Sequence, residues 1–427
     1  MKNFLKICPI RMTIKIYKLI SNLLIIPIII FFILRFCIGK ENFKSLTQKF
    51  SIYKYKIKRK KKLVWINAVS IGESKVGITI ADKIKSKYPN YDVLLTTSTI
   101  SSYKLLISMN LNLTVIYAPI DISIIVNRFI DLWKPSIAIF VESEIWPSTF
   151  SILKDRKIKL KILNARMSEN SFNKWYQFNS FSKELFKLID ECYVQDKYSE
   201  SRYSKLGVKT ILRIPNIKFL TKKPAFSKLE FSKFNTILKE KFVITIFSTH
   251  EGEEKMIIES LDYLITNKKN LFIIIIPRHI KRTHSIEKIL RKRKISYALR
   301  SKFIKYSKNK KVLLVDSFGE LPLFFKLSKI AIVGGSFLNK GGQNPIEASF
   351  FNCSVIFGPF MSNFSDISKK MLDYDAGFQV NDRNELNKKI LLLSNNTKLR
   401  IKTSKNFKKL CNNQNLLSSK VFNKILD

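Results

Sequence analysis

Apolar runs alternate with helical segments along the first half of the chain, and polar residues follow each run. The runs cover residues 63–69, 93–97, 115–117, 137–141 and 160–164, and segments 193–195 and 211–219 close this half. Helical segments extend to about residue 87, start again at residue 103, and cover 127–134. Strands that alternate with helices form a parallel sheet, and the sites of such sheets lie at the carboxyl ends of the strands.

The same pattern begins again after a basic, turn-rich joint over residues 221–227. Further apolar runs cover 242–247, 271–276, 311–315, 330–333 and 355–357, and a Lys/Asn-rich helical tail spans 383–427. We therefore expect an N-terminal domain over 40–222 and a C-terminal domain over 223–427. Both are predicted to be α/β halves that face one another across a cleft, with polar residues at the strand ends.

The stretch over residues 333–359 carries a local signature of its own. It turns through two glycine pairs and begins a helix at Asn344-Pro345, since Asn is a good N-cap and Pro fits the first helical position. Glu347 follows three residues after that cap and faces the unpaired N–H groups. A strand, a glycine loop and a helix form a phosphate or nucleotide pocket. The alternative is an ordinary βαβ unit with a well-capped helix.

Residues 1–39 contain an apolar run over 19–34 with basic residues on both sides. A helix of that length reaches about 24 Å, short of a hydrocarbon core of about 30 Å, so a tilted span would also need residues 14–18. No A-x-A-like site follows that would indicate a cleaved signal peptide. We expect an uncleaved anchor over 1–39 that spans the membrane or lies in its interface, with the remaining chain cytoplasmic.

The charge is lopsided, with 77 Lys and Arg against 32 Asp and Glu and a net charge of +45. Such basicity is typical of proteins that bind nucleic acid or an anionic membrane surface. The excess is spread over the whole chain together with abundant Ile, Asn and Phe, all encoded by A/T-rich codons, so genomic drift is an alternative cause. No RNP-type motif, zinc knuckle or basic zipper accompanies it, which argues against a nucleic-acid partner.

Cysteine and histidine usage argues against a metal site. Five cysteines stand far apart with no CxxC pair, which fits a reducing compartment. There are three histidines, and His250 lies in the segment HEGEE, which lacks the HExxH spacing that places two ligands on one helix face. We expect neither a structural metal nor a disulfide framework.

A series of motifs, in this order along the chain, resembles the 3-deoxy-D-manno-octulosonic acid (Kdo) transferases of lipopolysaccharide synthesis. The motifs are NAVSIGE, TTSTIS, YAPID, ESEIWP, NARMSENSF, STHEGEE, PRH, DSFGELP, VGGSFLNKGGQNPIE and GPFMSNF. The resemblance covers residues 65–364, most of the chain. It implies an α/β glycosyltransferase of the GT-B fold with two Rossmann-like domains, the acceptor on the N-terminal one and CMP-Kdo on the C-terminal one.

The resemblance also implies roles for individual residues. Glu73 corresponds to the catalytic base, and Glu142 and Lys218 correspond to residues that stabilise the transition state. CMP contacts fall on Pro277, Arg278, Phe318, Gly319, Glu320, Asn344, Pro345, Ile346 and Glu347. The implied reaction is an inverting transfer of Kdo from CMP-Kdo to a lipid A precursor, lipid IVA, at the cytoplasmic face of the inner membrane, without a cofactor.

The chain departs from the family pattern at a few loop positions. Gln343 stands where a His usually precedes NP, and Phe360 stands where a His usually follows GP. Pro215 and Leu220 replace a Gly and an Asp around Lys218. The core motifs stay intact, so these departures bear on loop geometry and turnover.

The reaction chemistry fits the front-domain residues, although each has a plainer interpretation. A base must take a proton from the acceptor hydroxyl, and a carboxylate at a helix N-terminus such as Glu73 is expected to stay ionised. An oxocarbenium-like sugar calls for a carboxylate and a departing phosphate for a cation, which Glu142 and Lys218 would supply. The plainer interpretations are a helix cap, a strand-end ion pair and a surface lysine, respectively.

Other interpretations stay open on the sequence alone. Arg278 suits a bidentate phosphate contact, and a salt bridge is its plainer role. For Glu347, capping and ligand binding are compatible. Rival functions are a GT-B transferase that uses a UDP-sugar and a basic nucleic-acid-binding protein. A degraded, inactive homologue is a further alternative, against which the retained Glu73, Arg278 and Asn344 argue.

Overall fold

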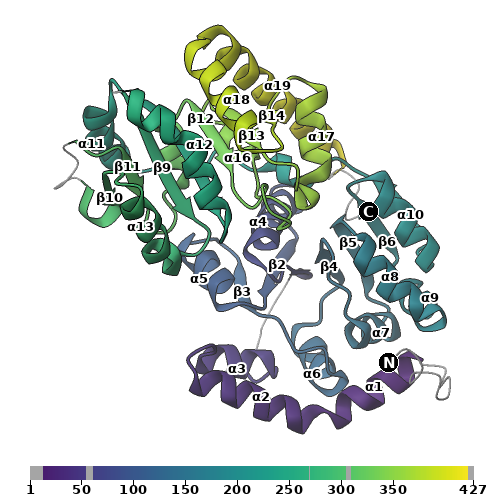
Figure 1. Cartoon of the computed structure of the whole chain (residues 1–427). Helices are drawn as coiled ribbons and strands as arrows, with labels where there is room; N and C mark the ends of the chain where they lie inside the picture. Colours follow the sequence, from purple (N-terminus) through teal and green to yellow (C-terminus); the bar gives the residue numbers. More distant parts are fainter. Residues whose placement is uncertain (1–12, 54–60, 269, 304–308, 422–427) are drawn as a thin grey trace, which may run out of the picture. The chain divides into compact units, whose positions relative to one another are not determined.

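The computed structural model describes residues 13–53, 61–268, 270–303 and 309–421 (Figure 1). The chain divides into two compact units. Unit 1 comprises Met1–Thr221 and Leu417–Asp427, and unit 2 comprises Lys222–Leu416. The end of the chain thus groups with unit 1, whereas the sequence pattern placed the whole tail in the C-terminal domain. The facing arrangement of the two halves stays a prediction.

Unit 1 is built on a parallel sheet in the order β3-β2-β1-β4-β5-β6-β7. The strands are β1 (Lys62–Asn67), β2 (Tyr91–Thr97), β3 (Thr114–Tyr117), β4 (Ile137–Val141), β5 (Lys159–Ala165), β6 (Glu191–Val194) and β7 (Ile211–Arg213). The strand order reverses between β1 and β4. In doubly wound sheets ligands bind in the crevice outside the carboxyl ends of the strands at such a reversal.

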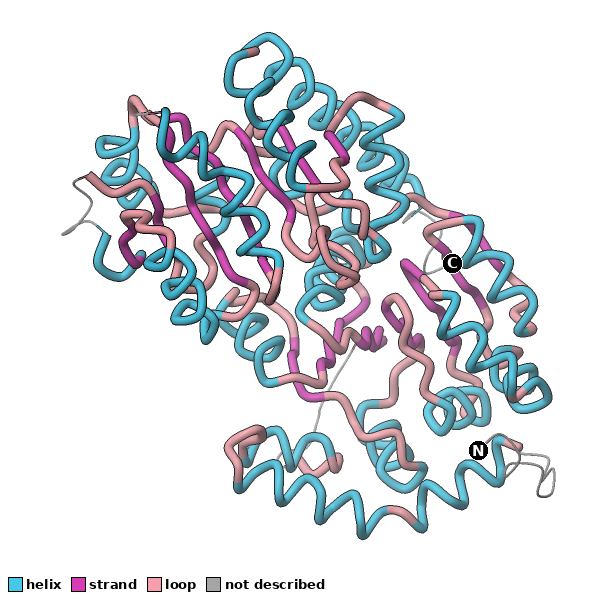
Figure 2. Tube along the Cα trace, in the orientation of Figure 1, coloured by secondary structure: helices cyan, strands magenta, loops and turns pink. Residues whose placement is uncertain are grey.

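Helices lie on both sides of this sheet, as Figure 2 shows. They are α4 (Ile71–Lys87), α5 (Ile100–Ser108), α6 (Ser123–Trp133), α7 (Pro147–Asp155), α8 (Glu169–Gln177), α9 (Asn179–Phe186) and α10 (Lys197–Leu206), with the short η1 (Ile217–Leu220). Successive strand residues feed two cores: Leu63 and Trp65 pack into one, and Val64 and Ile66 into the other. This alternation is the two-residue period of a strand buried on both faces.

Unit 2 repeats the design with a parallel sheet in the order β10-β11-β9-β8-β12-β13-β14. The strands are β8 (Phe242–Thr249), β9 (Leu271–Pro277), β10 (Tyr297–Leu299), β11 (Val312–Leu314), β12 (Ile330–Val333), β13 (Ser354–Phe357) and β14 (Phe378–Gln379). Here the order reverses between β8 and β12, so the loops that follow these two strands border the equivalent crevice.

The helices of unit 2 connect these strands and cover the sheet. They are α11 (Lys228–Leu238), α12 (Glu253–Asn267), α13 (Thr283–Lys292), α15 (Leu321–Leu327), α16 (Ile346–Ser349), α17 (Ser365–Asp373), α18 (Arg383–Asn395) and α19 (Thr397–Val421). Single 3-10 turns are η2 (Ile280–Arg282), η3 (Arg300–Lys302) and η4 (Ser362–Phe364). The prediction of two Rossmann-like α/β halves is confirmed.

Three N-terminal helices belong to unit 1: α1 (Ile14–Leu23), α2 (Ile25–Cys37) and α3 (Phe43–Lys49). Within the described residues no single helix is long and apolar enough to cross a membrane. The pair α1 and α2, bent by 54° at its break, meets that requirement by length and composition when taken together. The predicted anchor over 1–39 therefore stays a prediction, and its first twelve residues lie outside the described part of the chain.

Candidate active site

Glu73 lies in the first turn of α4, immediately beyond β1. Its carboxylate Oε2 accepts the backbone N–H groups of Val69 and Ser70 at 2.7 and 3.2 Å, and the Ser70 hydroxyl accepts the Glu73 N–H at 3.3 Å. This reciprocal capping box fixes the carboxylate over the end of β1. The helix-cap interpretation is therefore correct. Capping is compatible with a chemical role, because the Val69 and Ser70 N–H groups both donate to Oε2 and not to the second carboxylate oxygen, Oε1.

Burial raises the pKa of the Glu73 carboxyl to about 7, and the neighbouring charges of Glu144 and Glu142 act in the same direction. The hydrogen bonds from Ser70 and Val69 lower it, but they are outweighed. The expectation that the helix N-terminus keeps this group ionised is therefore wrong at neutral pH, where a carboxyl with a pKa of about 7 is only partly ionised. Desolvation and like charge dominate over the helix end. A carboxyl group that titrates near neutral pH is well suited to accept a proton in a transition state.

Glu142 and Lys218 form an ion pair, as the plainer interpretation of Glu142 proposed. The Lys218 Nζ lies 2.6 Å from the Glu142 Oε1, and both side chains are mostly buried. Glu142 follows β4 with a positive φ of 61°, which a non-glycine residue adopts at some strain. Its N–H still donates to the Leu163 carbonyl at 3.0 Å, so the turn begins while the residue is attached to β5. Lys218 is thus no ordinary surface lysine.

A buried amide network positions Lys218. The Asn164 Oδ1 accepts the Ile217 N–H at 2.9 Å, which holds η1 against the end of β5. The Gln195 side-chain amide donates to the Asn164 carbonyl at 2.6 Å and accepts from the Asn216 side chain at 2.7 Å. The Asn216 Oδ1 then caps η1 by accepting the Lys218 N–H at 3.0 Å. Each amide bonds to the next, so the lysine backbone has a defined position.

Two further ionisable side chains belong to this cluster. Glu144 accepts a hydrogen bond from the Trp146 indole N–H at 2.8 Å, and burial raises the pKa of its carboxyl, assisted by the charge of Glu142. Arg166 is half-buried, which lowers the pKa of its guanidinium, and the nearby Glu142 and Asp196 oppose that lowering. The cluster therefore gathers three carboxylates and two cations at the strand reversal of unit 1.

In unit 2 the predicted CMP-binding residues follow different strands. Pro277 is the buried last residue of β9, and the exposed Arg278 comes next, with its N–H donating to the Thr249 carbonyl at 2.9 Å. The Phe318 ring is 79% exposed and Gly319 has a φ of 83°, both in the turn after β11. All lie at the carboxyl edge of the sheet, as predicted.

Glu320 is occupied by an ion pair within unit 2. The Arg300 guanidinium donates to both of its carboxylate oxygens, with nitrogen–oxygen distances from 2.6 to 3.1 Å, and the Ser317 hydroxyl donates to it as well. The same guanidinium also reaches Glu230 at 2.7 Å. If Glu320 contacts CMP, the contact falls on its backbone or requires this pair to open.

The helix predicted to start at Asn344-Pro345 begins one residue later. It is α16, which runs over Ile346–Ser349 with Pro345 as its N-cap, so Pro345 is not the first helical residue. The Asn344 Oδ1 still accepts the Ile346 N–H at 3.0 Å, so its capping function is retained one position earlier. Pro345, Ile346 and Glu347 are buried. Asn344 is more exposed than these three residues.

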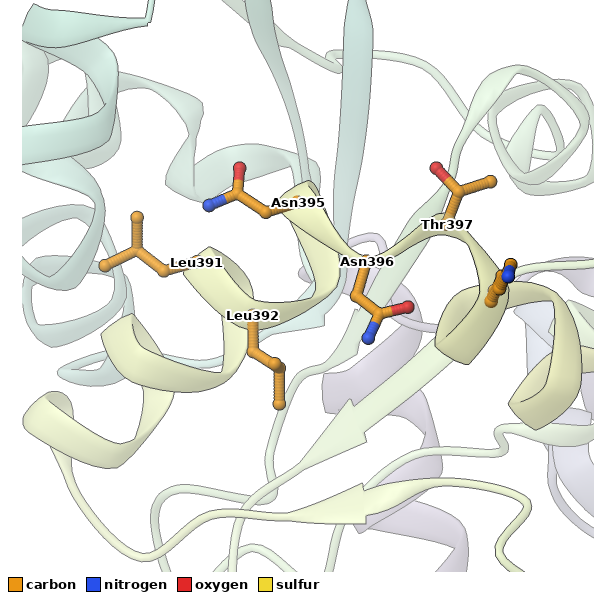
Figure 3. Close-up of a pocket in the computed structure, with 6 residues that line it drawn as sticks. Leu391, Leu392, Asn395, Asn396 and Thr397 are labelled. Carbon is orange, nitrogen blue, oxygen red and sulfur yellow. The ribbon is translucent and has the colours of Figure 1, made fainter.

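A separate hollow lies between α18 and α19 (Figure 3). Its lining residues are Leu391, Leu392, Asn395, Asn396, Thr397 and Lys398. None of them is a predicted site residue, and all follow the last strand of the sheet. In the described ranges no group of three or more His, Cys, Asp or Glu could hold a metal ion.

Comparison with known proteins decides the family. A family model described as 3-deoxy-D-manno-octulosonic-acid transferase matches residues 44–221. A 3-deoxy-D-manno-octulosonic acid transferase of Rickettsia conorii is 36% identical over 339 residues, which cover 79% of this chain and 73% of that protein. The one of Haemophilus influenzae is 31% identical over 74% of this chain and 75% of its own length. This chain belongs to the 3-deoxy-D-manno-octulosonic acid transferase family.

Solved structures with low sequence identity share the fold of this transferase. A glycosyltransferase from Rickettsia africae aligns with a TM-score of 0.61 at 14% identity, covering 86% of this chain and all of that one. A UDP-GlcNAc 2-epimerase from Neisseria meningitidis aligns with a TM-score of 0.60 at 12% identity, covering 86% and 99%. These likenesses concern the fold alone, which is GT-B as predicted.

The transferase keeps its ion pair despite its departures from the family pattern. Pro215 precedes η1 and Leu220 ends it, yet Lys218 meets Glu142 because Asn164 and Asn216 hold the backbone of the turn. Sequence reasoning missed Glu144 and Arg166 as members of the cluster. Their signal was present, since both lie within quoted motifs two residues beyond Glu142 and Asn164.

We expect Glu73→Gln to stabilise the transferase at alkaline pH. Because the folded-state pKa of Glu73 lies above its unfolded value of about 4.5, its contribution to stability is full below that value and is lost as the pH rises through about 7. The free energy of unfolding of the wild type, relative to Glu73→Gln, should fall by roughly 1–3 kcal/mol from pH 5 to pH 8. Urea unfolding at both pH values measures it.

The matched control is Glu240→Gln, which removes a carboxylate that is exposed to solvent. Its unfolding free energy should follow the wild-type pH dependence. Parallel curves for Glu73→Gln and the wild type would contradict the raised pKa of Glu73.

Proposed function

We propose that this transferase moves a Kdo residue from CMP-Kdo to a lipid A precursor with inversion at the anomeric carbon. The acceptor hydroxyl oxygen forms the new bond to the anomeric carbon as the bond to the phosphate oxygen breaks, and CMP leaves. Glu73 takes the hydroxyl proton. The observation that carries this proposal is a half-buried carboxylate held at the start of α4 by the Val69 and Ser70 N–H groups, at the strand reversal of unit 1, where burial and two neighbouring carboxylates raise its pKa to about 7.

Glu142 and Lys218 stabilise the charges that develop during transfer. In the resting protein the two opposite charges are paired at 2.6 Å. During transfer the carboxylate can face the cationic sugar, and the ammonium can face the departing phosphate. Each member stabilises the other while no substrate is bound. This arrangement supports the roles that the family motif assigns to both residues.

The donor nucleotide is assigned to unit 2. The exposed Arg278 side chain offers a bidentate contact to the phosphate, and the exposed Phe318 ring offers a stacking face to the cytosine. Asn344 and Glu347 lie beyond the glycine loop, where the family motif places further CMP contacts. A CMP leaving group carries one phosphate, which such groups can hold without a metal ion.

We expect Glu73→Ala to lower the rate of Kdo transfer by roughly 10²–10⁴-fold, because the acceptor hydroxyl then lacks its base. The assay incubates the full chain with CMP-Kdo and a tetra-acylated lipid A precursor and reads the product by mass. Glu240→Ala, which removes an exposed carboxylate, should transfer at the wild-type rate. Wild-type rates for Glu73→Ala would show that the base is misassigned.

We also propose that the transferase works at the cytoplasmic face of the inner membrane, with α2 lying in the membrane interface. This helix has 13 residues and none of them is buried. Ile26, Ile30 and Ile33 are all more than half exposed. At about 1.5 Å per residue α2 reaches roughly 20 Å, less than a hydrocarbon core of about 30 Å.

Both flanking helices attach α2 to the same unit. On one side, α1 packs against α6, α7 and α9. On the other, the Lys49 carbonyl of α3 accepts the Ile120 N–H at 3.0 Å, and the Gln48 Oε1 accepts the Tyr117 N–H of β3 at 3.0 Å. A helix whose two ends are held by the same compact unit fits an in-plane position better than a crossing one.

We expect the triple substitution of Ile26, Ile30 and Ile33 by Ser to weaken binding of the full chain to anionic phospholipid vesicles at least 10-fold, because less apolar surface enters the membrane. Vesicle co-sedimentation measures it. The control replaces Leu229, Leu372 and Ile401 of unit 2, which are exposed to a similar degree, by Ser and should bind as the wild type does. Unchanged binding of the α2 variant would contradict the in-plane placement.

A further inference from the structure

The loops after β8, β9 and β12 bring two histidines, an arginine and an amide together in unit 2. The His250 Nε2 lies 3.2 Å from the Gln343 side-chain nitrogen, and the His279 ring meets the His250 ring edge-on with centroids 6.3 Å apart. Arg278 joins them, because its backbone is hydrogen-bonded to Thr249, the residue before His250. We propose that His250 is a donor-binding residue whose imidazole N–H, beside the Arg278 guanidinium, binds the phosphate of the nucleotide sugar.

The position of His250 in the fold supports this role. It follows β8, the central strand, and the glycine loop that it touches follows β12, on the other side of the strand reversal. The crevice at a reversal of this kind is where doubly wound sheets bind their ligands. The inference rests on the proposed use of CMP-Kdo and adds a phosphate contact to the residues assigned above.

The His250 imidazole packs closely against Gly335, which has no side chain. This residue has a φ of 67°, and a Cβ there would lie 3.1 Å from the His250 Cδ2 and 3.4 Å from the Nε2. The Gly335 carbonyl in turn accepts the Gly342 N–H at 2.8 Å, which bends the loop back so that Gln343 reaches the ring. The loop therefore closes around one edge of the imidazole and fixes its orientation.

The contact with Gln343 engages the Nε2 edge of the His250 ring. With the Gln343 side-chain nitrogen as donor, the Nε2 accepts and the proton of a neutral ring lies on Nδ1. Burial lowers the pKa of His250, and the charges of Arg278, His279, Lys340 and Arg282 lower it further. A neutral ring that donates from Nδ1 amid several cations is suited to an anionic partner.

Two glutamates face this cluster, and both are bonded to groups of unit 2. The Glu253 Oε1 accepts the His250 and Gly335 N–H groups, each at 2.6 Å, and burial raises the pKa of its carboxyl to about 7. Glu254 is paired with Arg282 at 2.7 Å. Glu253 therefore occupies the start of α12, where an external anion would otherwise bind, and joins the two loops. We therefore place the phosphate at the side of the cluster formed by His250 and Arg278.

The test measures the dissociation constants of CMP and cytidine for the full chain by isothermal titration, with cytidine read by displacement of CMP. His250→Ala should weaken CMP binding roughly 10-fold or more, the value of a lost hydrogen bond to a charged group, and change cytidine binding less than 2-fold. The control His284→Ala, at a mostly exposed position in unit 2, should bind both as the wild type does.

Two conservative variants keep the test decisive if His250→Ala does not fold. The side-chain amide nitrogen of Asn lies near the position of Nδ1, and that of Gln lies near Nε2. His250→Asn should therefore retain more CMP affinity than His250→Gln. Equal affinities, or tighter binding by His250→Gln, would overturn the inference.

The remaining outcomes separate this inference from the proposed function. Unchanged CMP binding by His250→Ala, or an equal loss for CMP and cytidine, would overturn the phosphate contact while the proposed donor stands. A wild-type chain that does not bind CMP would overturn the proposed donor itself.

Discussion

Like charges held close together at a strand reversal are the constraint on which the chemistry of unit 1 depends. Strand β1 leads to Glu73 and strand β4 leads to Glu142 and Glu144, and the two strands are neighbours in the sheet. Lys218 pairs with Glu142 and the Trp146 indole donates to Glu144, whereas Glu73 has backbone donors alone among the bonds described above. Its raised pKa follows from where the strands end and from the burial of their ends.

Unit 2 uses the same topological feature with the opposite charge. The loops after β8, β9 and β12 carry histidine, arginine and glycine, and the buried Glu253 bonds to the loops after β8 and β12. Gly334 shows how tightly these loops fit: a Cβ there would lie 2.5 Å from the carbonyl oxygens of Phe247 and Ser248. The carboxyl edge of a parallel sheet thus provides the location of a site. The residues at the strand ends determine whether that site accepts a proton or binds an anion.

Much of this organisation could be predicted from the sequence, because long buried strands have a strong pattern. The runs over 137–141 and 330–333 agree with β4 and β12. The edge strands β10 and β14 were not predicted, since they have two or three residues and are defined by their neighbours. Helix α5 begins at Ile100 rather than at residue 103, because Thr99 caps it by accepting the Ser102 N–H.

The residues of the site could be predicted from the sequence, but their electrostatic interactions and pKa values could not. Glu73, Glu142 and Lys218 could be named from motifs, and the structure brings Glu142 and Lys218 into contact. The pKa of Glu73 could not be derived, because a helix N-terminus lowers it while burial and two neighbouring carboxylates raise it. Only the fold shows which effect is larger. The positive φ of Glu142 and the amides that hold Lys218 have no sequence signature either.

The pH dependence of kcat/KM for Kdo transfer tests the central claim most directly. If Glu73 is a base made available by burial among carboxylates, the rate should rise with pH along a limb whose midpoint lies near 7. In Glu144→Gln, which removes one of the neighbouring charges, that midpoint should move to lower pH while transfer continues. A limb with its midpoint near 4.5, or one that Glu144→Gln leaves in place, would contradict the account.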